Sequence, residues 1–264
     1  MREMTIEQLK ACQLGIMSEI HNFCDKNGLK YSLWGGSLIG AARHNGYIPW
    51  DDDMDICMLR KDYEFFIKNF NSDMYGVANC DDNALYPYPF AKAFDKTTKK
   101  VESIYLSENY EIGVDVDIFP IDELEDSSRL TKKIIRKRNR LIRLRLFSLF
   151  LKNERGLKGF LKRILAIVYN GKANKYSKKL NSDAKAFALK RFNRYMLYAD
   201  PNIKTPLLID KSIFEGYQLH KFENKEFYIV NEYDKLLTLC FGNWRKFPPE
   251  NQRVTHHSFV AYQK

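Results

Sequence analysis

The sequence has few of the features that mark exported, membrane-spanning or disulfide-linked proteins. Its 264 residues include only five cysteines, an odd number with no CxxC pair. We therefore expect neither disulfide bonds nor a cysteine zinc site, as in a reducing cytosol, and interpret the cysteines as small buried hydrophobes. The absence of a long apolar run predicts no transmembrane helix. The amino-terminal segment has no apolar signal region, so we do not expect export.

Acidic residues are scarce in one part of the chain. Residues 129–195 hold 22 lysines and arginines but only two acids, Glu154 and Asp183. The remainder holds 21 basic and 31 acidic residues, so the net charge of +10 conceals an acidic body with a basic insert. The insert is predicted to be helical from Ser127 to about Tyr195, and one apolar stripe has helical spacing: Leu157, Phe160, Leu161, Ile164, Leu165 and Val168.

The basic insert has three interpretations. Its lysines and arginines are solvated on a helical subdomain, or they contact anionic lipid headgroups or a lipid-linked glycan, or they contact nucleic-acid phosphates. No aromatic ladder or glycine-rich RNA motif supports the third, which is the least favoured.

The amino-terminal half mixes helical and strand patterns. Thr5 with Gln8 forms a capping box that predicts a helix ending at Gly28. "KYSLW" predicts a short strand, "GGS" a turn, "LIGAARH" a short helix, "DMDICML" a strand and "KDYEFFIKNF" a helix. "YPFAKAFDK" and "KKVESIYL" predict a strand pair, and "GVDVDIFPID" a strand ended by Pro120. This mixture indicates an α/β or α+β fold.

Towards the carboxyl end, "IFEGYQLHKFENKEFYIV" predicts a hairpin around "ENKE". "NEYDKLLTLCFG" predicts a helix closed by Gly242, and "NWRKFPPENQRVTHH" predicts a loop.

The most unusual stretch is "GYIPWDDDMDICM", which places four carboxylates within five positions: Asp51, Asp52, Asp53 and Asp55. Alternate residues of a strand share a face, so Asp53 and Asp55 are expected to project together, with Met54 and Ile56 turned into the core. The same rule places Asp115 and Asp117 of "GVDVDIFP" on one strand face.

If the two acidic strands are neighbours, three or four carboxylates converge, which is unfavourable without cations. Hard oxygen ligands of this kind suit Mg²⁺. The alternative is that these acids are solvated strand faces or helix caps. A calcium loop is disfavoured because "DDDMDICMLRKD" has neither the central glycine nor the final glutamate. The preceding "LWGGSLIGAAR" runs from strand to helix start, where backbone N–H groups and the Ser37 hydroxyl can bind phosphate.

A glycine-serine turn, a later Asp-x-Asp strand and a third Asp on another strand resemble the nucleotidyltransferase-fold superfamily. The string "GGSLIGAARHNGYIPWDDDMDICMLRKDYEFF" resembles the LicD family in particular, which includes phosphocholine transferases and fukutin-type ribitol-phosphate transferases. The resemblance continues at "FAKAFDKTT", at "VDVDIFPID" and in the carboxyl-terminal block from "FEGYQLHKF" to "RVTHH". It implies an α+β fold with a nucleotidyltransferase-like mixed sheet. Residues 127–195 match nothing in this family that we can place.

Residue by residue, the resemblance makes Asp53 and Asp55 a metal-binding pair and Asp117 the third ligand, with Asp115 one pleat away. The expected cofactor is Mg²⁺, in one or two copies, with Mn²⁺ as a substitute. Asp117 is also the hypothetical general base, and one histidine, His256, is assigned to substrate or proton transfer. The remaining substrate-binding candidates are Gly36, Ser37, Arg43, Lys92, Asp51 and Asp52, of which Gly36 and Ser37 are expected to hold donor phosphate.

The resemblance implies a Mg²⁺-dependent transferase. It would move a phospho-alcohol, by default phosphocholine, from a CDP-linked donor to a hydroxyl of a cell-surface glycan of the lipopolysaccharide, teichoic acid or capsule type. A true nucleotidyltransferase and a catalytically silent binding protein are the alternatives. The expected location is the cytoplasm, with peripheral contact at the inner face of the plasma membrane. We divide the chain into a catalytic core (1–126), the basic helical insert (127–200) and a carboxyl-terminal part of the catalytic domain (201–264).

Overall fold

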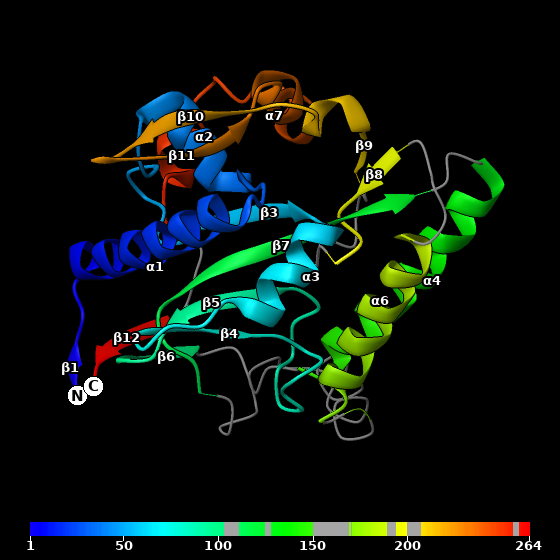
Figure 1. The fold of residues 1–264 in the computed structure, drawn as a ribbon, viewed down its shortest axis with the longest axis horizontal. Helices are drawn as coiled ribbons and strands as arrows, with labels where there is room; N and C mark the ends of the chain where they lie inside the picture. The colour runs from blue at the N-terminus through cyan, green and yellow to red at the C-terminus, as the bar shows by residue number, and fades with distance from the viewer. Residues whose placement is uncertain are drawn as a thin grey trace.

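A mixed β-sheet forms the centre of the fold in the computed structural model of the chain (Figure 1). Residues 1–102, 111–124, 128–149, 169, 171–188, 194–199, 207–255 and 259–264 are described. The sheet order is β2–β3–β7–β5–β4, with β3 and β7 parallel and the other neighbours antiparallel. These strands are β2 (Ser32–Leu33), β3 (Asp55–Leu59), β4 (Tyr75–Ala78), β5 (Ala91–Asp95) and β7 (Asp115–Leu124). The predicted α+β class is confirmed.

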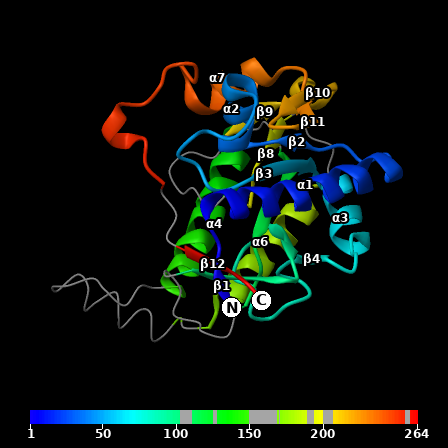
Figure 2. The same cartoon turned by 90° about the vertical axis from the view of Figure 1, so that its left-hand side faces the viewer.

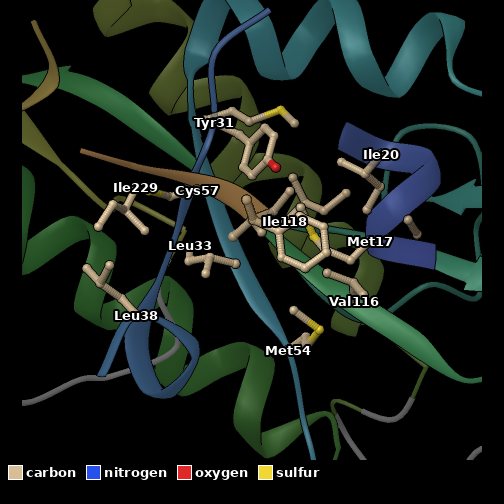
Figure 3. Packing of buried hydrophobic residues seen from close by; sticks show 14 of the residues in the cluster. Met17, Ile20, Tyr31, Leu33, Leu38, Met54, Cys57, Val116, Ile118 and Ile229 are labelled. Carbon is tan, nitrogen blue, oxygen red and sulfur yellow. The ribbon is translucent and has the colours of Figure 1, made fainter. Parts of the chain in front are cut away.

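Helix α1 (Ile6–Asn27) packs on one face of this sheet, and both of its predicted ends are confirmed. The Thr5 hydroxyl accepts the Gln8 N–H, the Gln8 side chain accepts the Thr5 N–H, and Gly28 closes the helix with φ 65°. In Figure 3, Met17 of α1 lies against Val116 and Ile118 of β7. The apolar residues of β7 therefore face α1, on the side of the strand opposite to Asp115 and Asp117.

Two short helices follow strands directly. Helix α2 (Gly35–His44) begins two residues after β2, and α3 (Arg60–Asn69) begins immediately after β3. The glycines expected to form a turn before the helix are instead its first residues, because the chain enters α2 at Gly35 with φ 55°, a value that glycine adopts without strain. That expectation was wrong, although the helix itself was predicted.

The basic insert contributes a pair of helices at one side of the molecule (Figure 1). Helices α4 (Ser128–Phe147) and α6 (Ala173–Ala188) pack together around Ile134, Ile142 and Leu180. The apolar stripe from Leu157 to Val168 lies outside the described residues. The predicted helix to Tyr195 is wrong at its end, because β8 (Arg194–Met196) pairs with the last residues of β7 and with β9 (Leu208–Asp210).

The carboxyl-terminal part forms a separate two-stranded sheet followed by a helix. The predicted hairpin is formed by β10 (Tyr217–Phe222) and β11 (Lys225–Val230), and the predicted helix is α7 (Tyr233–Phe241), ended by Gly242. These elements group with α2 at one end of the molecule (Figure 1). Single-turn helices occur at Lys211–Phe214 and at Glu250–Gln252, the latter within the predicted loop. The domain boundaries stay a prediction.

A small second sheet joins the two ends of the chain (Figure 2). In it, β12 (Phe259–Gln263) lies between β1 (Arg2–Glu3) and β6 (Thr98–Glu102). The strand pair predicted for "YPFAKAFDK" and "KKVESIYL" was wrong, because β5 pairs with β4 and β7 whereas β6 pairs with β12. Both strands exist, but they belong to different sheets.

Pro120 lies inside β7 rather than at its end, contrary to the prediction. The Asp117 N–H donates to the Met54 carbonyl on the β3 side, so alternation turns the nitrogen of residue 120 to the opposite edge. On that edge, pairing with β5 stops at Ile118 and pairing with β8 starts at Asp122. Proline is tolerated at position 120 because no ladder donor is needed there.

The structure also bears on two features that are scarce in the sequence, its cysteines and its long apolar runs. All five cysteines are free thiols, three of them buried. Among the described residues, no helix is both long and apolar enough to cross a bilayer.

Candidate active site

Asp55 and Asp117 lie side by side on the two parallel strands at the centre of the sheet. The register pairs Asp55 with Asp117 and Ile56 with Ile118. Both aspartates are half-buried, whereas the two isoleucines are buried in the core. The two acidic strands are therefore neighbours, and their alternation brings two of the three predicted metal ligands together.

Asp51, Asp52 and Asp53 form an acidic loop immediately before β3. One carboxylate oxygen from each lies within 4.8 Å of the others, and Asp52 is buried. The strand was predicted to start at Asp53 but starts at Asp55, so Asp53 approaches from the loop rather than from the strand face. The acidic loop and the Asp55–Asp117 pair together form what we call the acidic cluster.

Burial and neighbouring charge shift the pKa values of Asp55 and Asp117 upwards. Burial raises the pKa of Asp55 well above its usual value, and the negative charges of Asp53, Asp117 and Asp51 raise it further. Burial raises the pKa of Asp117 to about 6, although the ammonium group of Lys92 opposes this shift. For Asp55 and Asp117, the ionised form is therefore less favourable in the folded chain than in water, and added positive charge would favour it.

The amino-terminal turn of α2 lies directly against these carboxylates. A Cβ atom at Gly36 would lie 2.5 Å from Oδ2 of Asp51, and one at Gly35 would lie 3.0 Å from Oδ2 of Asp55. A side chain at position 36 would therefore require the Asp51 carboxylate to move. The Ser37 hydroxyl accepts the backbone N–H of Asp55 at 2.9 Å, which fixes α2 to the start of β3. The positive end of the helix dipole therefore faces the acidic cluster.

Lys92 and Lys100 lie beside the second acidic strand, β7, and bring positive charge to its aspartates. Lys92 is buried on β5, and its Nζ contacts Asp117 and lies 3.1 Å from Oδ2 of Asp115. Lys100 Nζ lies 2.7 Å from Oδ1 of Asp115. Lys100 and Lys92 lower the pKa of Asp115 despite its burial. Asp115 is thus neutralised by lysines, whereas Asp117 shares one lysine with it.

A brace that the sequence analysis missed supports the acidic loop from α1. The Gln13 side chain is buried, and its Nε2 donates to the Asp52 carbonyl at 3.0 Å. Its Oε1 accepts the Tyr47 hydroxyl at 3.2 Å, and the same hydroxyl lies 3.2 Å from the Lys10 carbonyl. A polar residue on the apolar stripe of an amphipathic helix was the only signal for this contact.

The remaining predicted residues fall in different places. Arg43 donates to the Trp244 carbonyl and to His44, both at 3.0 Å, and lies over the Phe247 ring, so it joins α2 to the carboxyl-terminal loop. His256 lies outside the described residues, and its assignment stays a prediction, as do the roles of Gly36, Ser37 and Lys92 in donor binding.

Comparison with known proteins gives matches over the acidic cluster and over the whole chain. Residues 28–144 match the family described as LicD/FKTN/FKRP, nucleotidyltransferase domain. The lipopolysaccharide cholinephosphotransferase LicD of Haemophilus influenzae is 27% identical over 271 aligned residues, which cover 99% of this chain and 99% of that protein. An uncharacterized protein of Rickettsia typhi is 33% identical over 34% of this chain and 33% of its own length.

The third similarity is shorter. The human ribitol 5-phosphate transferase FKRP is 54% identical over 35 residues, which are 13% of this chain and 7% of that protein. The family match contains the whole acidic cluster together with Lys92. Residues 28–144 therefore match the nucleotidyltransferase domain of the LicD family, and the chain is similar over its whole length to a LicD protein.

Proposed function

We propose that this protein transfers a phosphorylated small alcohol, by default phosphocholine, from a CDP-linked donor to a hydroxyl of a cell-surface glycan. The observation that carries the proposal is the register that pairs Asp55 with Asp117 beside Asp51 and Asp53. The names of two relatives, a lipopolysaccharide cholinephosphotransferase and a ribitol 5-phosphate transferase, support phospho-alcohol transfer as the reaction class. The choice of choline rests on the longer of the two matches.

Asp53, Asp55 and Asp117 fit a Mg²⁺ site by the chemistry of their donors. They offer hard carboxylate oxygens, which Mg²⁺ prefers. Burial and the neighbouring carboxylates raise the pKa of Asp55, and a bound cation would oppose both effects. When bound, Mg²⁺ supplies charge neutralisation for the transferring phosphoryl group and the leaving nucleotide. The charge of Lys92 is divided between Asp117 and Asp115, since its Nζ contacts both carboxylates.

Protein groups around the acidic cluster can bind and orient the reactants. The N–H groups in the first turn of α2 point towards the acidic cluster, where they can donate to a donor phosphate. Asp117 is half-buried beside Lys92, where its carboxylate can accept the proton of the attacking hydroxyl. The Gln13 brace holds the acidic loop in position during these steps.

A peripheral membrane position belongs to the same proposal. The exposed cations of α4 form a basic face: Lys132, Lys133, Arg136, Lys137, Arg140 and Arg143. Of these, Lys137 pairs with Asp183 of α6 at 2.7 Å. Such a face suits anionic headgroups near a lipid-linked acceptor. Co-sedimentation with vesicles containing phosphatidylglycerol should be strong at low salt and weak at high salt. Binding that does not change with salt would contradict this part of the proposal.

The test of the reaction is the mass of the product. The protein is incubated with a lipopolysaccharide acceptor and CDP-choline, CDP-ribitol, CDP-glycerol or CDP-ethanolamine, with and without Mg²⁺. A gain equal to one phospho-alcohol supports the proposal, whereas a gain equal to cytidine monophosphate indicates nucleotidyl transfer. No gain in mass with any of the four donors would count against both.

Asp117→Asn tests the proposed base, with donor binding and donor turnover measured separately. We expect binding to persist and turnover to fall by about two orders of magnitude or more. Glu123→Gln, on the same strand but paired with Lys211, is the matched control and should leave turnover unchanged. Near-normal turnover of Asp117→Asn would remove this residue from the mechanism.

A further inference from the structure

Two arginines and two aromatic side chains gather next to the acidic loop, and the proposed chemistry assigns them no combined role. We call Arg43, Trp50, Phe247 and Arg253 the arginine–aromatic cluster. The guanidinium carbon of Arg43 lies 4.5 Å from the centre of the Phe247 ring, and that of Arg253 lies 5.5 Å from the same ring. Arg253 also lies 5.7 Å from the centre of the Trp50 ring. Two cations therefore share one aromatic platform.

Backbone carbonyl groups hold both guanidinium groups in place. Arg43 donates from one terminal nitrogen to the Trp244 carbonyl at 3.0 Å. Arg253 donates from Nε to the Pro248 carbonyl at 2.9 Å. This hydrogen bond does not use the two terminal amino groups of its guanidinium. Both arginines are half-buried, so their positions are set before any ligand arrives. Preorganised donors of this kind lose little entropy on binding.

Carboxylate groups balance this charge poorly. Within the described part of the chain, the ion pair of Arg253 is a 4.0 Å contact with the highly exposed Glu250, and Arg43 has no carboxylate partner. Burial lowers the pKa of Arg43, and the nearby charge of Arg253 lowers it further. Arg245, on the same loop, differs because it stacks on Trp244 and lies 2.7 Å from Asp234. The cluster thus has an excess of positive charge that an anion would balance.

The position of the cluster points to the kind of anion. Gly36 lies against the acidic loop, and Arg43 follows it by seven residues in α2. Seven residues are about two helical turns, so both residues lie on the same side of α2, about 10 Å apart along its axis. Trp50 directly precedes Asp51, and its carbonyl accepts the Thr255 hydroxyl at 3.2 Å. A nucleoside diphosphate whose terminal phosphate lay at the acidic cluster would extend over a comparable distance. Phe247 is 45% exposed, which leaves an aromatic surface for a base.

We propose that the arginine–aromatic cluster binds the nucleoside diphosphate part of the donor. Arg43 and Arg253 contact the phosphate next to the nucleoside, because guanidinium groups form paired hydrogen bonds with phosphate oxygens. The base stacks on the exposed aromatic surface of Phe247 and Trp50. Identifying this ligand as the donor rests on the proposed function, but nucleotide binding at the cluster does not require that transfer occur.

The experiment is calorimetric titration of the full chain with CDP, UDP, ADP and inorganic pyrophosphate, in the presence of Mg²⁺. Arg253→Gln is the main variant, because Arg253 is partly exposed and its replacement should not prevent folding. Phe247→Leu removes the platform, and Arg245→Gln is the matched control on the same loop. Circular dichroism melting curves are recorded for each variant.

We expect the wild-type chain to bind at least one nucleoside diphosphate. Arg253→Gln should bind the same nucleotide at least about tenfold more weakly, because the loss of one charge-assisted hydrogen bond has an effect of that size. Phe247→Leu should weaken nucleoside diphosphate binding but leave pyrophosphate binding within twofold of the wild-type value. Arg245→Gln should match the wild type. Equal nucleotide binding by Arg253→Gln and the wild type would overturn the proposal, as would a wild-type chain that binds none of the nucleotides.

Transfer assays separate this proposal from the proposed function. If nucleotide binding depends on Arg253 but no phospho-alcohol is transferred, the role of the arginine–aromatic cluster in binding is supported and the proposed reaction is contradicted. Normal transfer with an unchanged KM for the donor in Arg253→Gln would overturn the cluster and leave the reaction intact.

Discussion

The two ends of the β3–β7 strand pair differ in how their charged groups are arranged. At one end, Asp55 and Asp117 converge with Asp51 and Asp53, and Lys92 is shared with Asp115. At the other end, Arg60, the first residue of α3, donates to Asp122 of β7 at 2.6 Å.

The Arg60–Asp122 end is balanced and cross-linked. A terminal nitrogen of Arg60 donates to Asn181 of α6 at 2.7 Å and to Glu64 at 3.0 Å. This network fixes the helical insert to the sheet. Paired buried charges indicate a structural role, whereas like charges gathered at a strand end indicate a functional one. The same two strands therefore carry a structural tie at one end and a candidate site at the other.

The largest expected effect comes from Asp55→Asn. We expect transfer activity to fall by at least about three orders of magnitude, because a metal ligand would be lost. Without Mg²⁺, the melting temperature should stay the same or rise, since the substitution removes a carboxylate whose ionisation is opposed by burial and by three neighbouring carboxylates. Activity assays and calorimetric melting check both statements. A clear fall in melting temperature would mean that Asp55 is a structural residue.

Arg60→Met is expected to show the reverse pattern. Removal of the guanidinium leaves Asp122 as an unpaired buried charge, which should lower the free energy of unfolding by about 3–5 kcal/mol. Urea denaturation measures this loss. The double variant Arg60→Met/Asp122→Leu should recover most of it, because no charge is then left unpaired. A single variant as stable as the wild type would refute the structural tie.

Gln13→Leu should lower stability less than Arg60→Met does, and it should also lower activity. It leaves the buried Asp52 carbonyl without the Gln13 donor and should cost about 1–3 kcal/mol of unfolding free energy. Because the acidic loop loses its brace, kcat should fall about tenfold or more even under conditions where the variant is fully folded. An unchanged kcat would show that the brace serves folding alone. Cys12→Ser, at the neighbouring position of α1, is the control.

Lys211→Met should give the smallest change. Its contact with Glu123 of β7 spans 2.8 Å, but both side chains are partly exposed. The expected loss is below about 1 kcal/mol, measured by urea denaturation, because solvent screens such pairs. A loss as large as that of Arg60→Met would show that burial does not explain the difference between the two ion pairs.

Local signals in the sequence predicted much of the site. The alternation of "VDVDIFP" and "DMDICM" placed Asp117 and Asp55 away from the core, and the register then brought them together. The capping box, Gly28, Gly242 and the hairpin turn were also predicted from local rules.

The errors and omissions have a common physical origin in contacts between distant segments. Pro120 is tolerated inside β7 because two partner strands leave a gap at its edge. The Gln13 brace and the Arg60–Asn181 contact join residues far apart in the chain. No local pattern encodes these pairs.

The central claim, that the acidic cluster binds a divalent cation, is tested most directly by the melting temperature with and without Mg²⁺. For the wild-type chain we predict a rise on adding Mg²⁺, since an ion at 100 times its dissociation constant stabilises the folded state by about 2.7 kcal/mol. For Asp55→Asn we predict little or no rise, with Glu123→Gln behaving as the wild type. An equal rise in Asp55→Asn, or none in the wild type, would contradict the claim.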